Sequence, residues 1–534
     1  MAGLLRRGST RPKVNPIPSF KTTLRAGLLT SAAFGAAAFG SGAARAYYFM
    51  PNNLVVSESV FVPNTGEAAS LTVGAPIAYP LDGSGTPVAA VGTTGNALAT
   101  DANLGVFTNS KPDANFGITS ALTLVQVNPL NGAISAPLVL PTSQIVTSFP
   151  SKSEGSLYLT QNGQALTITG YDVAASGRAP VGAVDVSNSS TSATTPAQAL
   201  TTGNANGTVN RTVAQINGIG TVVTTDTNAY SGNNGRGAIQ YNGQYYMVGN
   251  GNVGATGVEL LNPANPATQT TTTPNTTQIG TYNITQNGYA ADKVLKDNNF
   301  RGEIIYNNTL YVTKGSGSNG IDTVYQVGAA GALANGAQLP ANAPITILPG
   351  FPTGLAKTSA DFTPFGLFFA NDSTLYVSDE GTGTATDLAQ HAGLQKWSLV
   401  NGTWVLDYTL RSGLTGTTQT YSAAGFTGTV TENGLRDITG VVNGDGTVTI
   451  YGVTSTTDNI LNMDNGADPN ELVAITDDLA ATVLPGSESF SVLVAPTLGT
   501  VVRGVSFAPV PEPVSLTLLG MGIAGLGLVR RRRA

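Results

Sequence analysis

The chain lacks cysteine and contains a single histidine, His391, among its 534 residues. These two shortages exclude disulfide bonds, thiolate zinc sites, iron–sulfur clusters, cysteine nucleophiles and any site that needs two histidines. Charge is also scarce, at 10% of residues, whereas glycine is abundant, with 65 residues. The length allows one large domain or two to three smaller ones. The composition therefore restricts metal and nucleophile chemistry but not the formation of a hydrophobic core.

The few charges are distributed unevenly along the chain. Of the 25 Lys and Arg residues, seven lie in residues 1–46 and four in residues 511–534. By contrast, 30 of the 31 Asp and Glu residues lie in residues 47–510. Such an acidic body lacks the basic clusters that bind phosphates, so we expect no nucleic-acid partner. Basic segments at the two ends are typical of a chain that is handled by a membrane.

Residues 1–46 predict a secretory signal peptide. A basic leader precedes the apolar, alanine-rich stretch 26–43, which is followed by Ala44-Arg45-Ala46. Small residues at Ala44 and Ala46 occupy the positions that a signal peptidase reads, which predicts cleavage after Ala46. An uncleaved membrane anchor is the alternative. Export agrees with the absence of cysteine, because a free thiol is a liability in an oxidising compartment.

The other end of the chain, residues 511–534, has three consecutive parts. An uncharged run, residues 514–529, predicts a short transmembrane helix, because its length lies just under the minimum of about 17 residues. The arginines after it would stay cytoplasmic, which leaves the body on the outer side of the inner membrane. The flanking residues are Pro511, Glu512 and Pro513 before the run, and Arg530, Arg531, Arg532 and Arg533 after it.

This three-part tail resembles the PEP-CTERM sorting signal of Gram-negative bacteria. The resemblance implies recognition by an exosortase-type enzyme, removal of the helix near Pro511, Glu512 and Pro513, and release or attachment at the cell surface. It also implies an association with bacteria that make exopolysaccharide. A permanent single-pass anchor is the alternative. The resemblance covers only the last two dozen or so residues and does not describe the body.

Residues 47–510 predict an all-β body. Short alternating or β-branched segments recur between Asn-Gly, Asp-Gly and glycine-rich turns, as in residues 121–140, 242–250, 307–315 and 441–455. Val, Ile, Thr and Tyr suit a half-buried pleated surface, and Asn-Gly or Asp-Gly supplies the positive φ of tight hairpins. Long amphipathic helical periodicity is missing.

A repeat within the body predicts a β-propeller of six blades, with seven as the alternative. Four strands begin with an arginine followed by Gly or Asp, and several of these heads are roughly 65 to 70 residues apart, which exceeds a compact blade and implies long loops. The last such unit has no later strands, whereas the N-terminal strands have no first strand. Pairing the two ends would close the ring and remove the open sheet edge. Two packed sandwiches are the alternative. The four arginines are Arg236, Arg301, Arg436 and Arg503.

These arginines are the candidate ligand-binding residues. If each heads an innermost strand, Arg236, Arg301, Arg436 and Arg503 surround one mouth of the channel, where they could hold a carboxylate, a sulfate or an acidic sugar. The alternative is structural, with each arginine donating to carbonyl groups of a neighbouring blade.

Two other features carry less specific predictions. The loop 464–471 offers oxygen ligands for calcium, but its spacing matches no EF-hand and turn chemistry explains it, so no metal or cofactor is expected, with calcium as an alternative. His391 lacks a Gly-x-Ser-x-Gly partner motif and is expected in a surface loop. The candidate calcium ligands are Asp464, Asn465, Asp468, Asn470 and Glu471.

Together these patterns predict a non-enzymatic protein that is exported, transiently anchored in the inner membrane and then located at the cell surface or in the extracellular matrix. Its partners would be signal peptidase, an exosortase-type enzyme and an extracellular polysaccharide or other matrix component. One alternative is a propeller hydrolase or lactonase with a channel metal, and another is a purely structural matrix protein.

The tail generates a test. A chain without residues 511–534 should be exported but not processed, because it lacks the sorting segment. Immunoblots of membrane and extracellular fractions would show this outcome, and membrane retention identical to that of the full chain would contradict it.

Overall fold

The computed structural model describes residues 48–60, 76–81, 87–89, 119–149, 151–172, 210–230, 234–250, 256–263, 276–280, 288, 298–317, 319–358, 362–383, 391–423, 426–458, 464, 466–497 and 499–510. The predicted signal peptide and sorting tail, residues 1–46 and 511–534, lie outside these ranges. Cleavage after Ala46 and the helix over residues 514–529 therefore stay predictions. In the part of the chain that the structure describes, no helix is long and apolar enough to cross a membrane.

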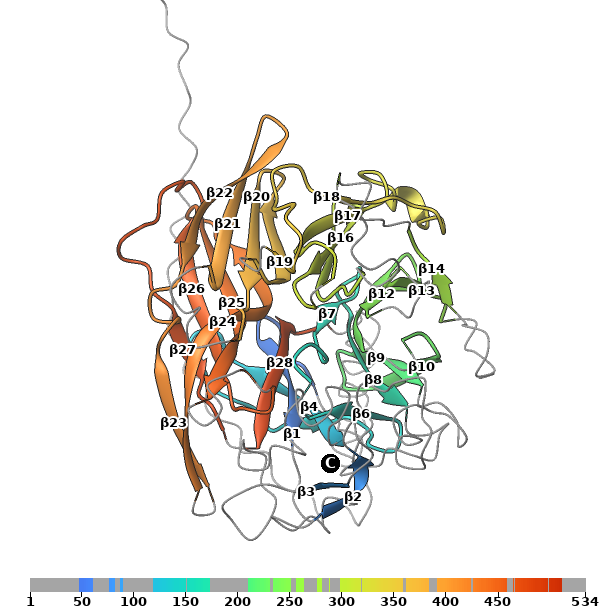
Figure 1. Ribbon diagram of the computed structural model, residues 1–534, viewed down its shortest axis with the longest axis vertical. Coiled ribbons are helices and arrows are strands. Elements are labelled where there is room, and N and C mark those ends of the chain that lie inside the picture. Colours follow the sequence, from blue (N-terminus) through green and yellow to red (C-terminus); the bar gives the residue numbers. More distant parts are fainter. Residues whose placement is uncertain are drawn as a thin grey trace, which may run out of the picture. The chain divides into compact units, whose positions relative to one another are not determined.

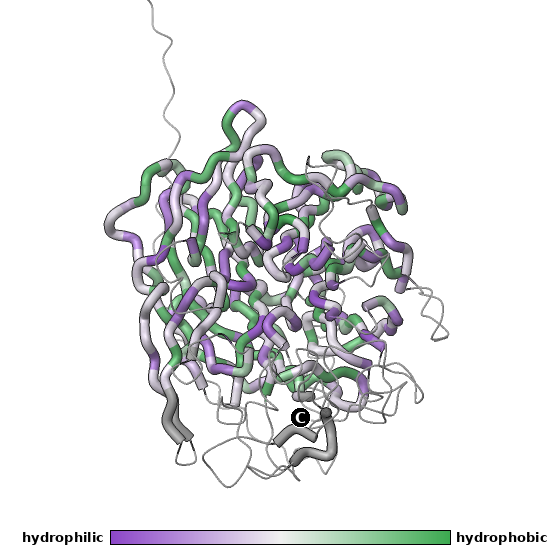
Figure 2. The backbone as a smooth tube through the Cα atoms, viewed as in Figure 1, coloured by the Kyte–Doolittle hydropathy of each residue, from purple (hydrophilic) through white to green (hydrophobic). Residues whose placement is uncertain are grey.

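The described residues confirm the all-β prediction. They form 28 strands, and their one helical segment is a 3-10 turn at Ala334–Gly336. Apolar and polar residues alternate along many of the strands (Figure 2). Because successive side chains point to opposite faces of a strand, this alternation gives the strand one apolar face, which packs against a neighbouring sheet, and one more polar face.

Asparagine closes several of the predicted hairpins. Asn242 and Gly243 have φ values of 50° and 76° between β11 (Gly235–Tyr241) and β12 (Gln244–Gly249). Asn401 and Gly402 repeat this conformation between β21 (Gly393–Val400) and β22 (Thr403–Leu410), with φ values of 51° and 80°. Two successive residues in the left-handed region match the right-handed twist of the flanking strands, which is why Asn-Gly favours these two-residue turns.

Four sheets contain four or five antiparallel strands that are consecutive in the sequence (Figure 1). In the first, β11 and β12 are followed by β13 (Val258–Leu261) and β14 (Thr276–Gln278). The second contains β15 (Glu303–Tyr306), β16 (Thr309–Lys314), β17 (Thr323–Val327) and β18 (Ile345–Ile347). The third contains β19 (Pro364–Asn371), β20 (Thr374–Asp379), β21 (Gly393–Val400) and β22 (Thr403–Leu410). The fourth contains β23 (Thr418–Ala423), β24 (Phe426–Val442), β25 (Thr447–Asp458), β26 (Leu472–Asp478) and β27 (Ser491–Val494).

A fifth sheet has nine strands and joins the two ends of the body. Its main path runs β10-β9-β8-β6-β4-β1-β28, while β5 pairs with β4 and β7 pairs with β8. A separate pair consists of β2 (Pro76–Leu81) and β3 (Pro87–Ala89). The nine strands are β1 (Leu54–Val60), β4 (Thr119–Val127), β5 (Leu138–Val139), β6 (Ile145–Ser148), β7 (Tyr158–Leu159), β8 (Ala165–Asp172), β9 (Arg211–Asn217), β10 (Val222–Thr227) and β28 (Thr500–Phe507).

The arrangement is propeller-like, but the predicted count of six separate blades is wrong. Four sheets form separate blade-like units, whereas the strands expected to make the remaining two blades belong to one continuous sheet. The physical reason is β6, which pairs with β4 through Thr119 and Ser120 and with β8 through Tyr171 and Asp172. This short strand bridges what would otherwise be two sheets.

The predicted pairing of the two ends is confirmed. β1 pairs antiparallel with β28 along its whole length, from Leu54 opposite Phe507 to Val60 opposite Thr500 (Figure 1). A bulge between Ser57 and Glu58 interrupts the register. Because β28 also contacts β24 and β25 of the preceding sheet, the series of sheets returns to its starting point.

Apolar side chains fill the space between successive sheets. The two halves of the nine-stranded sheet also share a core, which includes Leu124 and Ile168. Burying large apolar side chains contributes roughly 1.5–3 kcal/mol each, so these interfaces hold the sheets together. Pairs that belong to the same core cluster across an interface are Val213 with Met247, Tyr246 with Leu310, Val324 with Leu367, Leu394 with Val473, and Val453 with Val502.

The closure predicts a large effect of removing β28. A chain that ends after Gly499 should melt roughly 10 °C or more below a chain that ends after Val510, given about 2–4 °C per kcal/mol in large domains. The loss follows from the exposed edge of β1 and the opened core around Val502 and Val505. Thermal unfolding followed by circular dichroism measures the difference, and equal melting temperatures would show that the ends do not close the body.

Candidate functional site

The four recurring arginines lie together at the inner strands. Arg236 lies in β11, Arg436 in β24 and Arg503 in β28, while Arg301 lies two residues before the start of β15. All four are buried, with exposed fractions of 7% or less. Burial lowers the pKa of Arg301, and the neighbouring positive charges of Arg236 and Arg436 lower it further. Burial and Arg436 likewise lower the pKa of Arg503, to about 9. The arginines are thus close enough to influence one another, and their placement around a channel mouth stays a prediction.

Two of these guanidinium groups donate to backbone carbonyls across the body. Arg236 Nη1 donates to Phe300 O at 2.8 Å, and its Nε donates to Ser153 Oγ at 2.7 Å. Arg503 Nη2 donates to Gly466 O at 3.0 Å and also to Phe149 O. These are the carbonyl contacts that the structural alternative expects. The ligand-binding role of the four arginines stays a prediction.

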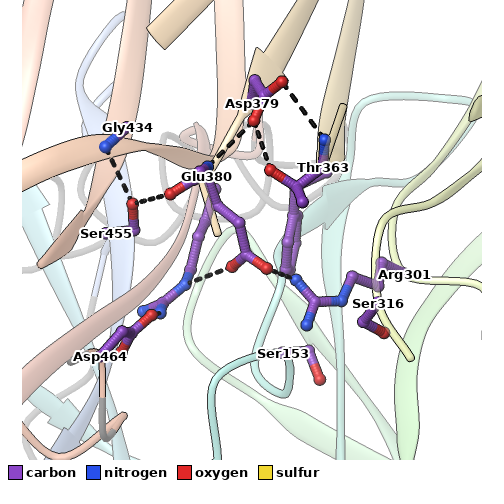
Figure 3. Close-up of polar contacts among 12 residues, drawn as sticks. Ser153, Arg301, Ser316, Thr363, Asp379, Glu380, Gly434, Ser455 and Asp464 are labelled. Atoms are coloured by element: carbon purple, nitrogen blue, oxygen red, sulfur yellow. Dashed lines mark hydrogen bonds and ion pairs between the residues drawn. The ribbon is translucent and has the colours of Figure 1, made fainter. Parts of the chain in front are cut away.

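The other two arginines share one carboxylate. Glu380 accepts from Arg436 Nε at 3.0 Å and pairs with Arg301 through its second oxygen (Figure 3). Arg436 also pairs with Asp464. Burial opposes ionisation of Asp464, but the positive charges of Arg436 and Lys152 outweigh it and lower its pKa. We call these four residues the ion cluster, which links three regions of the sequence: Arg301, Glu380, and Arg436 with Asp464.

Hydrogen bonds fix the backbone that carries Glu380. Ser455 Oγ donates to Glu380 O at 2.6 Å and accepts from Gly434 N at 2.9 Å (Figure 3). The preceding residue, Asp379, accepts from Thr363 N at 3.3 Å and from the Thr363 hydroxyl. These hydrogen bonds therefore fix the backbone of Glu380 independently of its two ion pairs.

His391 is not a free surface residue, contrary to the sequence expectation. Its Nδ1 lies 3.1 Å from Asp379 Oδ2, and its side chain is only 12% exposed. Asp379 also accepts from Gly381 N and Gln395 Nε2. This contact anchors the chain at the start of β21. It does not orient His391 toward a nucleophile.

Two of the candidate calcium ligands contact other residues through their side chains. Asp464 pairs with Arg436, while Asn470 donates to Thr454 O and Val502 O, both at 2.9 Å. Asn465 lies outside the described residues. Among the residues that the structure describes, no group of three His, Asp or Glu side chains is arranged to hold a metal ion.

A cavity of about 360 Å³ lies one to five residues further along the same inner strands. We call it the axial cavity. β7, β11, β15, β19, β24 and β28 each contribute to its wall. Its polar lining includes Tyr158, Gln240, Glu303, Asp437 and Ser506, and apolar side chains such as Phe368 complete it.

Asp437 in β24 binds the backbone of β28 and of the residue before β7, and its pKa is raised. Its Oδ2 accepts from Leu157 N at 3.2 Å and from Val505 N at 3.0 Å. Burial raises its pKa to about 7, although the backbone donors partly oppose this effect. A carboxyl group that changes charge near neutral pH thus lines the cavity.

Glu303 lies in the same cavity without a hydrogen-bond partner on either carboxyl oxygen. It is 3% exposed, and burial alone raises its pKa well above the ordinary value. Glu303 and Asp437 both act on Tyr158, whose pKa rises through burial and then through these two acids. An unpaired buried carboxyl is costly, so it is a candidate for ligand contact.

Sequence analysis did not single out Tyr158, Glu303 or Asp437. A signal existed for the two acids, because Asp437 directly follows Arg436 and Glu303 follows Arg301 by two residues. The recurring arginine therefore marks the strand, while the next residues on that strand form the cavity. Nothing in the sequence near Tyr158 indicates its position.

Comparisons with known proteins give no family. No protein-family model and no curated protein matches the chain. Among solved structures, a PL25 polysaccharide lyase, an ulvan lyase, shares 9% identity over 72% of this chain and 90% of its own, with a TM-score of 0.30. The N-terminal domain of Nup159 shares 7% identity over 86% of this chain and 97% of its own, with a TM-score of 0.28. TM-scores this low support no argument about this chain.

The ion cluster generates a stability prediction. Glu380→Gln should lower the free energy of unfolding by about 3–5 kcal/mol, because it leaves two buried guanidinium groups without their shared countercharge. Urea denaturation at pH 7 measures this change.

The matched control is Glu259→Gln, since Glu259 is buried in β13 and hydrogen-bonds Thr276 but burial raises its pKa to about 7. This control should change the stability by less than about 1 kcal/mol. Equal effects of the two substitutions would mean that the shared carboxylate does not stabilise the arginines.

Proposed function

We propose that the protein is exported, sorted at the cell envelope and displayed or released there, and that its propeller-like body binds a glycan in the axial cavity without catalysing a reaction. The N-terminal and C-terminal segments support the route, since they resemble a signal peptide and a PEP-CTERM tail. The axial cavity supports the binding role. The arginine cluster supports it less, because each of its guanidinium groups already contacts a carboxylate or a carbonyl group of the protein.

The single observation behind the binding role is the lining of the axial cavity. Its volume of about 360 Å³ falls within the usual range for small-molecule sites. Hydroxyl, amide and carboxyl groups alternate around the wall with apolar side chains, among them Gln240, Thr439, Ser506 and Phe368. A sugar ring offers hydroxyl groups at its rim and C–H groups on its faces, so such a mixed lining suits it.

One observation favours a second candidate, a glycan hydrolase. Two carboxyl groups with raised pKa values, Glu303 and Asp437, line one cavity, and a carboxyl with a pKa of about 7 can serve as a general acid. The binding assay should therefore be followed by detection of new reducing ends. Their appearance would assign the hydrolase.

The binding role has a direct test. The full chain should bind an oligosaccharide from an exopolysaccharide mixture, and Gln240→Ala should weaken binding about tenfold through the loss of one cavity hydrogen bond. The control is Gln278→Ala, the same substitution on the exposed strand β14. Isothermal titration calorimetry measures both, and equal affinity of both variants would place the glycan outside the axial cavity.

A further inference from the structure

The ionisable groups that line the axial cavity are all acidic. Its titratable lining groups are Glu303 from β15, Asp437 from β24, Tyr158 from β7 and Tyr241 from β11. β19 and β28 contribute Leu367, Phe368, Val505 and Ser506, none of which titrates. No lysine, arginine or histidine lines the cavity among the described residues. An anionic group placed there would meet two carboxyl groups and no cation.

The arginines do not compensate for the cavity acids. Arg301 precedes Glu303 by two residues, yet its guanidinium group pairs with Glu380. Burial is the one influence on the pKa of Glu303, with no contribution from a positive charge. The side chain is almost fully buried and both oxygens lack a donor within the protein, so they can accept from a donor group that reaches them.

A glycine brings two of the oxygens together. A Cβ atom on Gly237 would lie 2.8 Å from Glu303 Oε1 and 3.0 Å from Tyr158 Oη. Both oxygens therefore pack against the backbone of β11 at one point, Gly237, where no side chain fits. Asp437 acts electrostatically on the same tyrosine, so a second carboxyl lies near this point.

An ammonium group fits this arrangement better than a hydroxyl group does. It brings three N–H donors and one positive charge to a place that offers acceptor oxygens and no cation. A hydroxyl group brings one donor and no charge, and a carboxylate or sulfate brings no donor and a negative charge. Pairing an ammonium with a buried carboxylate also removes the penalty of an uncompensated charge.

From this geometry we infer that the axial cavity binds an amine-bearing ligand, of which an amino sugar is the glycan form, with its ammonium group between Glu303, Tyr158 and Asp437. The inference rests on the proposed glycan-binding function and specifies the class of glycan. Binding moves the proton of a neutral carboxyl to the solvent, and the resulting carboxylate pairs with the ammonium group.

The test compares probes that differ mainly in charge. Calorimetry with the full chain at pH 7 would use deacetylated chitotriose, N-acetylated chitotriose, an oligoglucuronate and ethanolamine. The deacetylated trimer should bind at least tenfold more tightly than the acetylated trimer, and the oligoglucuronate most weakly. Titrations in two buffers with different ionisation enthalpies should show that amine binding releases protons.

Raising the pH from 5.5 to 7 should strengthen amine binding. Burial raises the pKa of both cavity carboxyls, that of Asp437 to about 7, so a higher pH favours the carboxylate form that pairs with the ammonium group. Binding of the acetylated trimer should change little over the same range, because it requires no carboxylate.

Glu303→Gln tests the residue. This isosteric change should remove most of the preference for the amine and keep binding of the acetylated trimer. Glu259→Gln, the matched change at a buried glutamate outside the axial cavity, should leave both affinities unaltered. The melting temperature at pH 8 should be unchanged or higher for Glu303→Gln, since it removes an unpaired buried carboxyl, and this measurement separates a binding effect from misfolding.

The outcomes separate the inference from the proposed function. Equal or tighter binding of the acetylated trimer or the oligoglucuronate would overturn the amine inference and keep glycan binding. If ethanolamine binds and none of the three oligosaccharides does, the result would support the amine site and contradict the glycan role. The absence of binding by all four probes would overturn both.

Discussion

The antiparallel pairing of β1 with β28 is the constraint on which the rest of the body depends. It places the last described strand between the N-terminal strands and the preceding sheet, and so adds Arg503, Val505 and Ser506 to the inner surface. Asp437 then binds the backbone of this strand and that of Leu157 through one oxygen. A contact between residues 280 positions apart can form only when the sheets have closed on one another.

Along the inner strands, the arginines and the cavity acids have different surroundings. The arginines lie at the strand heads and find Glu380, Asp464 and several carbonyl groups, whereas Glu303, further along, finds no donor. Buried ion pairs contribute little net stability relative to apolar packing, because desolvation offsets the attraction. The role that we assign to the cluster is to fix how loops from different sheets meet, while the apolar interfaces supply the stability.

The sequence indicated the strands far better than the cavity. The arginine heads marked β11, β15, β24 and β28, and asparagine marked their hairpins, because both signals act over a few residues. The merging of two expected blades through β6 was not predictable, since Ile145–Ser148 is only four residues long and either of its edges could pair. The meeting of Glu303 with Tyr158 depends on Gly237, and three segments so far apart carry no shared local pattern.

The arginines at the strand heads and the acids of the axial cavity lie at different positions along the inner strands. This separation also decides which ligand charge the protein tolerates. If the arginines faced the axial cavity, an acidic sugar would be the natural ligand, as the recurring guanidinium groups first suggested. Glu380 and Asp464 instead neutralise Arg301 and Arg436 at the strand heads. The acids of the cavity are thereby left without a countercharge from the protein, and a positively charged ligand is the group that can provide one.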